Sequence, residues 1–497
     1  TVESFAATAR GLGADAVGIN CSLGPKEIFP MAKRLTEALP GSFPVFVKPN
    51  AGLPRADGSG YDITPQLYAM QMKPYRELGL FAAGGCCGTT PEFIQLLNGV
   101  FADCRPGRPD HPVKSVVCSP MDCVDVDGIT VVGERINPTG KKRFQQALRE
   151  GDMNYVLEQA VSQTEAGAQI LDVNVGAPGV DEPALMEQVV KALQSVVSLP
   201  LQLDSSHAEA LERGLRVYNG KPIVNSTNGE PEKLAAILPL CKKYGAAILC
   251  LPITEDGVPK TAAERLKAIT YIIDNAKKAG LDDGDFLLDA LVMTVSADKN
   301  ACREVLKTLQ LYRQHLGFPS TMGLSNISFG LPNRPLINST FFTMCLAAGL
   351  DAPIMNPYDE SMQKALKASA ALLGDDPCGL AFSQDESNLA VPKKAAVMKT
   401  TDLPILDAIK QAVIEGEKDI IVGLVVQALQ EGKTGNEITE KGLTAAMTEI
   451  GEDFGSGRMF LPQVLLSAET MRAAFDKLKE LIPASAEADK GTVVIAT

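Results

Sequence analysis

The sequence lacks the features that direct a protein to a membrane, to secretion or to nucleic acid. No apolar run approaches the roughly 20 residues that span a bilayer, and residues 1–15 lack the basic start and apolar core of a signal peptide. Basic residues are in deficit, with 47 Lys and Arg against 60 Asp and Glu and a formal net charge of −13. A broad nucleic-acid surface needs clustered Lys and Arg. We therefore expect a cytoplasmic protein with small-molecule ligands and no membrane or nucleic-acid partner.

Cysteine is too scarce for a disulfide scaffold, with 11 residues in a chain of 497. In a cytosolic protein such cysteines are expected to be reduced, catalytic or metal-bound. The length allows roughly two to four domains, and the hydrophobic content of 45% fits globular folding. The chain begins at Thr1 and ends in GTVVIAT, which has the pattern of a first buried strand. We therefore expect a piece of a longer polypeptide.

Apolar runs that end in polar residues recur through the middle of the chain, and a helical pattern follows each run. Buried parallel strands alternating with helices explain this pattern, which predicts a complete (β/α)₈ barrel over residues 126–385. The polar tips are Glu134 with Asn137, Asp172 with Asn174, Asp204, Asn225, Asp289, and Ser325 with Asn326. Each Asp or Asn taken alone could instead cap the next helix. Their number in one region favours a binding floor at one end of the barrel.

Residues 1–110 predict three further strand–helix units, which make part of a second (β/α)₈ barrel. Cys21 follows the first strand, and Cys86 and Cys87 follow the third. Three thiolates on one rim suit Zn²⁺, whereas the alternative is that each cysteine is a small buried apolar residue. A Cys-Cys pair between Gly85 and Gly88 is uncommon in a core, which favours the metal.

The remaining segments complete the predicted domain order. Residues 111–125 are polar and contain proline, which predicts a linker, and we expect its cysteines, Cys118 and Cys123, to be incidental. Residues 386–402 predict a second linker. A period of about 3.6 residues then predicts an all-α four-helix bundle over 403–486, and 487–497 predict the first strand of a further α/β domain.

Two sets of motifs resemble known families. GINCSLGP and GGCCGTTPEFI resemble the homocysteine S-methyltransferase domain, in which one Cys and a Cys-Cys pair hold zinc. GERINPTG, LDVNVGAP, LDSS, NSTNGE and GLSNISFGLPNR resemble pterin-binding methyltransferase barrels. In this order on one chain, the motifs resemble cobalamin-dependent methionine synthases. The N-terminal part of the homocysteine barrel and the family's cobalamin domain, with its cobalt-ligating histidine, are absent from this sequence.

The resemblance implies two methyl transfers, from 5-methyltetrahydrofolate to cobalamin and from the methylcobalamin so formed to zinc-bound homocysteine. It implies zinc on Cys21, Cys86 and Cys87, pterin contacts from Asp204, Asn225 and Asp289, and Asn326 near N5 of the pterin. Asn326 and Asp204 are the implied catalytic residues, and Arg334 lies at the family's spacing after Asn326. Glu134, Asn137, Asp172 and Asn174 are expected to shape the floor. Phe454 and Leu461 match the family's apolar residues that cover the methyl-bearing face of cobalamin. A further domain of the same parent chain would bind the opposite face.

Neither of two histidines near the predicted site needs a catalytic role. His207 is expected to start the helix after Asp204, and His315 to lie near a helix C-terminus, where its charge would favour the helix dipole. Three rival functions stay open at this point. They are a methyltetrahydrofolate:corrinoid methyltransferase that acts on a separate carrier, a dihydropteroate synthase, and a non-catalytic corrinoid-binding module.

Overall fold

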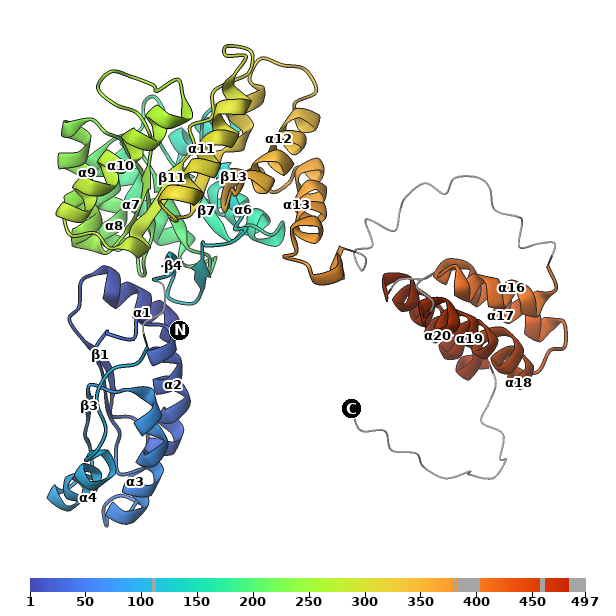
Figure 1. The fold of residues 1–497 in the computed structure, drawn as a ribbon, viewed down its shortest axis with the longest axis horizontal. Coiled ribbons are helices and arrows are strands. Elements are labelled where there is room, and N and C mark those ends of the chain that lie inside the picture. Colours follow the sequence, from blue (N-terminus) through green and yellow to red (C-terminus); the bar gives the residue numbers. More distant parts are fainter. Residues whose placement is uncertain (110–112, 380, 383–402, 456–460, 482–497) are drawn as a thin grey trace. The chain divides into compact units, whose positions relative to one another are not determined.

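The computed structural model describes residues 1–109, 113–379, 381–382, 403–455 and 461–481. The chain divides into two compact units, Thr1–Ser369 and Ala370–Thr497. Figure 1 colours the chain from blue at the N-terminus, through a green and yellow barrel, to red C-terminal helices. Within the described ranges, no helix is long and apolar enough to cross a membrane.

Eight parallel strands form a closed barrel in the first unit (Figure 1). Consecutive strands pair along the chain, and the last strand pairs with the first. The strands are β6 (Val132–Ile136), β7 (Ile170–Asn174), β8 (Leu201–Asp204), β9 (Ile223–Thr227), β10 (Ala247–Cys250), β11 (Phe286–Asp289), β12 (Ser320–Gly323) and β13 (Ala352–Met355). The prediction of a complete (β/α)₈ barrel is therefore confirmed.

Helices cover the outside of this barrel because alternate strand residues point outward and are apolar. They are α5 (Lys142–Glu150), α6 (Met153–Glu165), α7 (Glu182–Leu193), α8 (Ala208–Val217), α9 (Pro231–Tyr244), α10 (Ala262–Lys278), α11 (Ala301–His315), α12 (Arg334–Ala348) and α13 (Glu360–Leu373). Outward residues such as Ile248 and Leu288 join the core beneath these helices. Inward residues such as Ala247, Leu249 and Leu287 form a separate cluster. Since all strands run parallel, their C-terminal tips meet at one mouth of the barrel.

The sequence predicts a linker over residues 111–125, but its described part forms a hairpin. Strands β4 (Val116–Cys118) and β5 (Cys123–Asp125) pair antiparallel, with Cys118 opposite Cys123. Val117 and Val124 join the cluster of inward barrel side chains. Cys118 also exchanges two backbone hydrogen bonds, of 2.9 and 3.0 Å, with Lys221, which lies just before β9. The hairpin therefore covers the N-terminal end of the barrel, and strands of three residues are too short to give a sequence pattern.

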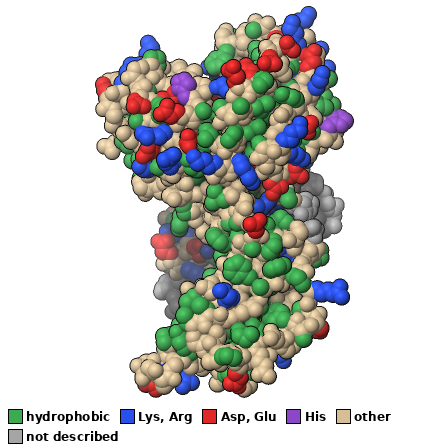
Figure 2. Space-filling view, turned by 90° about the vertical axis from the view of Figure 1, so that its left-hand side faces the viewer, with side chains coloured by type: hydrophobic (Ala, Val, Ile, Leu, Met, Phe, Trp, Pro, Cys, Tyr) green, Lys and Arg blue, Asp and Glu red, His purple; other side chains and the backbone are tan. Residues whose placement is uncertain are grey.

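The N-terminal segment contains the three predicted strand–helix units. Its strands lie in the order β1 (Val17–Asn20), β2 (Val45–Lys48) and β3 (Ala82–Ala83), all parallel. Its helices are α1 (Val2–Gly11), α2 (Pro25–Glu37), α3 (Pro65–Met72), the 3₁₀ helix η1 (Lys73–Leu78) and α4 (Pro91–Phe101). Figure 2 shows hydrophobic side chains gathered over this segment. Exposed apolar residues of the segment include Leu53, Met70 and Phe81.

The second unit is all-α in its described residues, as predicted. Its helices are α16 (Ile405–Ile414), α17 (Lys418–Gln430), the short α18 (Gly435–Glu437), the π-helix η6 (Ile438–Thr444), α19 (Ala445–Gly455) and α20 (Leu461–Leu481). Residues from each long helix, among them Ile409, Val425, Ile450 and Ala474, share one buried core. The predicted linker 386–402 and the predicted strand 487–497 lie outside the described residues.

Candidate active site

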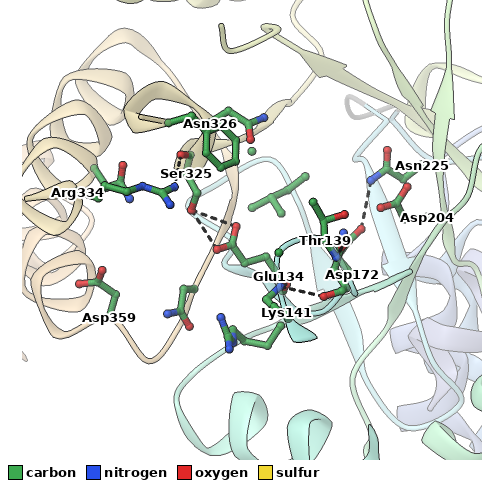
Figure 3. Close-up of a pocket in the computed structure, with 18 of the residues that line it drawn as sticks. Glu134, Thr139, Lys141, Asp172, Asp204, Asn225, Ser325, Asn326, Arg334 and Asp359 are labelled. Carbon is green, nitrogen blue, oxygen red and sulfur yellow. Dashed lines mark hydrogen bonds between the residues drawn. The ribbon is translucent and has the colours of Figure 1, made fainter. Parts of the chain in front are cut away.

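A cavity of about 740 Å³ opens at the mouth where the C-terminal tips of the barrel strands meet. Figure 3 shows its lining side chains, which come from strands on opposite sides of the barrel. All predicted folate residues except Asn174 line it, namely Glu134, Asn137, Asp172, Asp204, Asn225, Asp289, Asn326 and Arg334. The register of a closed parallel barrel brings these residues together although they span about 200 positions of sequence.

Two carboxylates and three side-chain amides form a hydrogen-bonded cluster on one side of the cavity. Asp172 Oδ1 accepts hydrogen bonds from Gln202 Nε2 at 2.7 Å and from Asn225 Nδ2 at 3.2 Å. Asp204 Oδ2 accepts one from Asn174 Nδ2 at 3.0 Å. Asn174 therefore lies behind Asp204 and orients it without lining the cavity. Because Asn225 donates to Asp172, its carbonyl oxygen is left to accept from a ligand.

The electrostatics of this network follow from burial. Burial and the neighbouring charge of Asp204 raise the pKa of Asp172 well above its ordinary value. Burial also raises the pKa of Asp204 to about 6, against the hydrogen bond from Asn174, which lowers it. A ligand that donates N–H groups to these oxygens would favour the ionised carboxylates.

Asp289 closes the floor at the tip of β11. Its Oδ1 accepts from the backbone N–H of Leu291 at 2.6 Å, and its carbonyl accepts from the buried Tyr312 hydroxyl at 3.3 Å. The guanidinium of Arg265, which is almost fully buried, donates to the carbonyl of Ala290 at 2.9 Å. Burial raises the pKa of Asp289 to about 7.

This raised pKa gives a pH-dependent contribution to stability. Between the ordinary pKa of 3.8 and the folded pKa of about 7, the native state holds a proton that the unfolded chain has released. The unfolding free energy therefore falls as pH rises through this window. We expect the melting temperature to fall from pH 5 to pH 8, and to fall less in Asp289→Asn, which keeps the size and an acceptor oxygen. Asp274→Asn, on the exposed face of α10, is the control and should follow the unmodified chain, and equal slopes for all three would contradict the expectation.

The opposite side of the cavity is built around the 3₁₀ helix η3 (Leu324–Ser328), which carries Asn326. Ser325 Oγ donates to Glu134 at 3.0 Å from Oε1 and 3.3 Å from Oε2 (Figure 3). Arg334 donates to Ser328 Oγ and to the Ser325 carbonyl, both at 2.9 Å. The guanidinium of Arg334, predicted to contact folate, is therefore engaged with η3 while it lines the cavity.

Several lining residues were outside the sequence prediction. Lys141 Nζ donates to the carbonyls of Glu134 and Asn137, at 2.9 and 3.1 Å, and so fixes the loop after β6. Asn137 Oδ1 accepts from the Thr139 backbone N–H at 2.9 Å in the same loop. Thr139, Lys141 and Asp359 line the cavity beside Ser325, which the sequence analysis places at a strand tip. Thr139 and Lys141 both belong to the GERINPTGK motif. This motif could therefore have indicated that the loop after β6 shapes the site.

The three predicted metal-binding cysteines converge at the tips of β1 and β3. Their sulfurs all lie within 4.8 Å of one another, with Cys21 3.5 Å and Cys86 3.9 Å from Cys87. Tetrahedral zinc with Zn–S bonds of 2.3 Å places its sulfurs roughly 3.8 Å apart, so the spacing fits this ion. A backbone hydrogen bond from Ser22 and contact with Cys87 lower the pKa of Cys21.

Asn50 supports this thiol cluster and was missed by the sequence analysis. It is 6% exposed, its Oδ1 accepts from the Cys87 backbone N–H at 3.1 Å, and its amide bonds to Cys21 and helps to lower the pKa of that thiol. Tyr61 packs on the turn, since a Cβ on Gly88 would meet its ring at 2.3 Å. Buried amides that orient thiolates carry no sequence pattern of their own.

The other predicted positions lie in helices. His207 caps α8 and pairs with Glu182, Nδ1 to Oε2, at 2.9 Å, and His315 ends α11. Both were predicted at helix ends. Phe454 and Leu461 fall in α19 and α20, but their side chains lie outside the described residues.

Three protein families match this chain. The homocysteine S-methyltransferase family matches residues 1–101, the pterin binding enzyme family matches residues 133–356, and the B12 binding domain family matches residues 405–479. The first match contains the three clustered cysteines. The second spans the barrel strands, and the third spans the helical bundle.

Comparisons over nearly the whole of this chain agree with the family matches. Methionine synthase of Mycobacterium tuberculosis is 32% identical over 98% of this chain and 43% of its own length. That of Mycobacterium leprae is 31% identical over 99% of this chain and 44% of its own length. The chain thus spans less than half of these relatives. Among solved structures, dihydropteroate synthase of Yersinia pestis is 14% identical over 53% of this chain and all of that chain, with a TM-score of 0.41. The motif resemblance is therefore confirmed: the chain is similar to the methionine synthases, and its segments match the homocysteine S-methyltransferase, pterin binding enzyme and B12 binding domain families in that order.

Proposed function

We propose that this chain takes part in methyl transfer from 5-methyltetrahydrofolate, by way of cobalamin, to zinc-activated homocysteine, which gives tetrahydrofolate and methionine. The observation that carries the proposal is the cavity at the barrel mouth. Asp204, Asn225, Asp289 and Asn326 line it together, in a region that matches the pterin binding enzymes. The thiol cluster and the B12-binding match lie on the same chain.

The polar groups of the cavity suit a pterin. A pterin edge offers several N–H donors and a carbonyl acceptor, and carboxylates and side-chain amides complement both. Asp204 and Asp289 would accept ring N–H groups, and the free carbonyl of Asn225 would accept another. Asn326, on the opposite side, would donate to N5. The methyl group leaves from N5 with the bond pair staying on nitrogen, so a donor at N5 stabilises the charge that develops there.

Homocysteine activation is proposed for the thiol cluster. Cys21, Cys86 and Cys87 would hold zinc by three sulfurs, with Asn50 orienting the turn between them. Zinc, when bound, lowers the pKa of a coordinated thiol so that the thiolate exists at neutral pH. The chain's own residues supply the ligands and leave one tetrahedral position for the substrate.

Cobalamin is the proposed partner of both sites. Cobalamin, when bound in its Co(I) form, supplies the nucleophile that accepts the methyl group. The B12 binding domain match covers the helical bundle, and we propose that Phe454 and Leu461 cover the methyl-bearing face of the corrin. A cobalamin domain of the same parent protein is the proposed carrier, since the matched relatives are more than twice as long as their aligned part.

Free cob(I)alamin tests the folate half of this proposal. The chain is mixed with 5-methyltetrahydrofolate and cob(I)alamin, and the decay of the cob(I)alamin absorbance is followed. Methyl transfer is expected, with tetrahydrofolate as the product. A dihydropteroate synthase would instead condense a pterin pyrophosphate with an aminobenzoate, so that pair is the control substrate. Absence of both folate binding and methyl transfer would refute the proposal.

Loss of a single pterin contact should weaken folate binding measurably. We expect Asp204→Ala, Asn225→Ala and Asp289→Ala each to lose about 1–3 kcal/mol of binding free energy, because a buried polar partner is left unsatisfied. Isothermal titration with 5-methyltetrahydrofolate measures the loss. Asn228→Ala is the matched control, because its amide caps the Glu230 backbone N–H at 3.0 Å, outside the cavity lining. Affinities equal to that of the control would exclude these residues as pterin contacts.

A further inference from the structure

The helix η3 is a weak element that carries a central residue of the site. It spans Leu324–Ser328, five residues of 3₁₀ type, and its N-terminus has no side-chain cap. Such helices have poorer hydrogen-bond geometry than α-helices and are stable only as short pieces. Leu324 and Ile327 anchor it in the core. The position of Asn326 between these two anchors therefore depends on what holds the polar residues of η3.

Two side chains from other elements, Glu134 and Arg334, form hydrogen bonds with η3, and both bond to Ser325. The Ser325 hydroxyl donates to Glu134 of β6, which lies 191 positions earlier in the chain. The Ser325 carbonyl accepts from Arg334 of α12 at 2.9 Å. In Figure 3, Glu134 and Arg334 approach Ser325 from different elements, next to Asn326. Ser325 is thus fixed on both sides immediately before the residue proposed to act at N5.

The surroundings of Glu134 show that this contact is its main polar interaction. A buried carboxyl is costly unless it is hydrogen-bonded. Burial raises the pKa of Glu134, and the hydrogen bond from Ser325 opposes this. The neighbouring Lys141 ammonium donates to the backbone carbonyls of Glu134 and Asn137 instead of to the carboxylate. The Glu134 carboxylate on β6 is therefore placed to accept from Ser325 after β12, and β13 lies between these two strands.

The amide of Asn326 also sits in a defined place. A Cβ on Gly323, the last residue of β12, would lie 3.3 Å from Asn326 Nδ2. The amide therefore lies close against a glycine, and a shift of η3 would move it away from its present position. A displacement of about 1 Å in a group that must meet a reacting atom can cost roughly a hundredfold in rate.

We propose that Glu134 is a positioning residue, which fixes Asn326 for methyl transfer by holding η3 through the Ser325 hydroxyl. The inference rests on the function proposed above only for its kinetic consequence. Its structural content, that Glu134 orders η3, holds without any ligand. This role is more specific than the sequence prediction for Glu134, which is a folate-site residue that shapes the floor.

Hydrogen exchange tests the structural part without folate. Amide exchange of residues 324–328 is measured by mass spectrometry in Glu134→Ala, Ser325→Ala and the double variant. Each single variant should exchange faster than the unmodified chain, and the double variant should exchange no faster than the singles, because both remove one contact. Glu134→Gln keeps an acceptor and should stay within about twofold of the unmodified chain. Glu150→Ala, on the exposed end of α5, is the matched control.

Kinetics test the consequence for Asn326. Single-turnover methyl transfer to cob(I)alamin should slow roughly tenfold to a hundredfold in Glu134→Ala and in Ser325→Ala, with folate affinity changed much less. In an Asn326→Ala background, Glu134→Ala should alter the rate by no more than about twofold, since Glu134 acts through Asn326. Ser325→Ala removes only an oxygen, so it decides the matter if Glu134→Ala fails to fold.

The two outcomes are separable. Unchanged exchange of η3 in both single variants overturns the inference, whatever the ligand. Equal losses of folate affinity and rate in Glu134→Ala, or additive effects with Asn326→Ala, also overturn it and identify a direct contact. If the unmodified chain binds no 5-methyltetrahydrofolate, the proposed function fails, and the exchange result alone then decides the role of Glu134.

Discussion

Replacing Cys21, Cys86 or Cys87 by alanine is expected to abolish stoichiometric zinc binding by this chain. Each sulfur occupies one corner of a cluster whose members lie within 4.8 Å of one another. Removal of one leaves two protein ligands, fewer than structural or catalytic zinc sites use. Zinc content after incubation with the metal and gel filtration measures the effect. The unmodified chain should hold about one zinc ion per molecule.

Two comparisons make this expectation specific. Cys104→Ala removes a cysteine from the same segment but outside the cluster, and it should leave the zinc content unchanged. Folate affinity should be unchanged in all four variants, because the cavity is lined by residues of the barrel. Zinc retained in each of the three cluster variants would show that these cysteines are not the zinc ligands. Zinc absent from the unmodified chain would have the same consequence.

The barrel could be predicted because most of its strands are short apolar runs with a polar residue at or just after the C-terminal end. Ile170–Asn174, Leu201–Asp204 and Phe286–Asp289 end in this way, and burial of a parallel sheet on both faces favours the apolar runs. The hairpin of Val116–Cys118 and Cys123–Asp125 could not be predicted in this way. Its strands are three residues long and include Cys and Asp, and they become strands through contact with Lys221 and the barrel interior.

The residues that line the site could be predicted from the sequence, but the hydrogen bonds among them could not. A polar residue at a strand tip must reach the mouth of the barrel, which is why Asp204, Asn225 and Asp289 line one cavity. Which of them face a ligand and which orient a neighbour depends on contacts between strands. Asn174 donates to Asp204, and Arg334 donates to η3. Asn174 and Asp204 lie 30 positions apart in the sequence, and Arg334 lies 6 and 9 positions from its two partners. No motif in the sequence indicates these contacts.

Replacing Asn326 by alanine is expected to slow methyl transfer far more than it weakens folate binding. As the bond from N5 to the methyl group breaks, N5 gains electron density, and a hydrogen bond donated by the Asn326 amide strengthens in the transition state. Loss of one such donor typically costs about 10²–10³ in rate. Single-turnover transfer to cob(I)alamin and isothermal titration measure the two effects separately. We expect the affinity to fall by no more than about tenfold, in line with one modest hydrogen bond.

Asn326→Asp separates hydrogen-bond donation from packing. The carboxylate has almost the same shape as the amide and fits the same space against Gly323, but it carries no N–H donor. If donation to N5 is what matters, this variant should transfer the methyl group as slowly as Asn326→Ala, and lowering the pH until the carboxyl is protonated should restore part of the rate. A rate close to that of the unmodified chain at neutral pH would assign Asn326 a packing role. A loss of folate affinity with an unchanged single-turnover rate at saturating folate would show that the amide binds the substrate and its transition state equally.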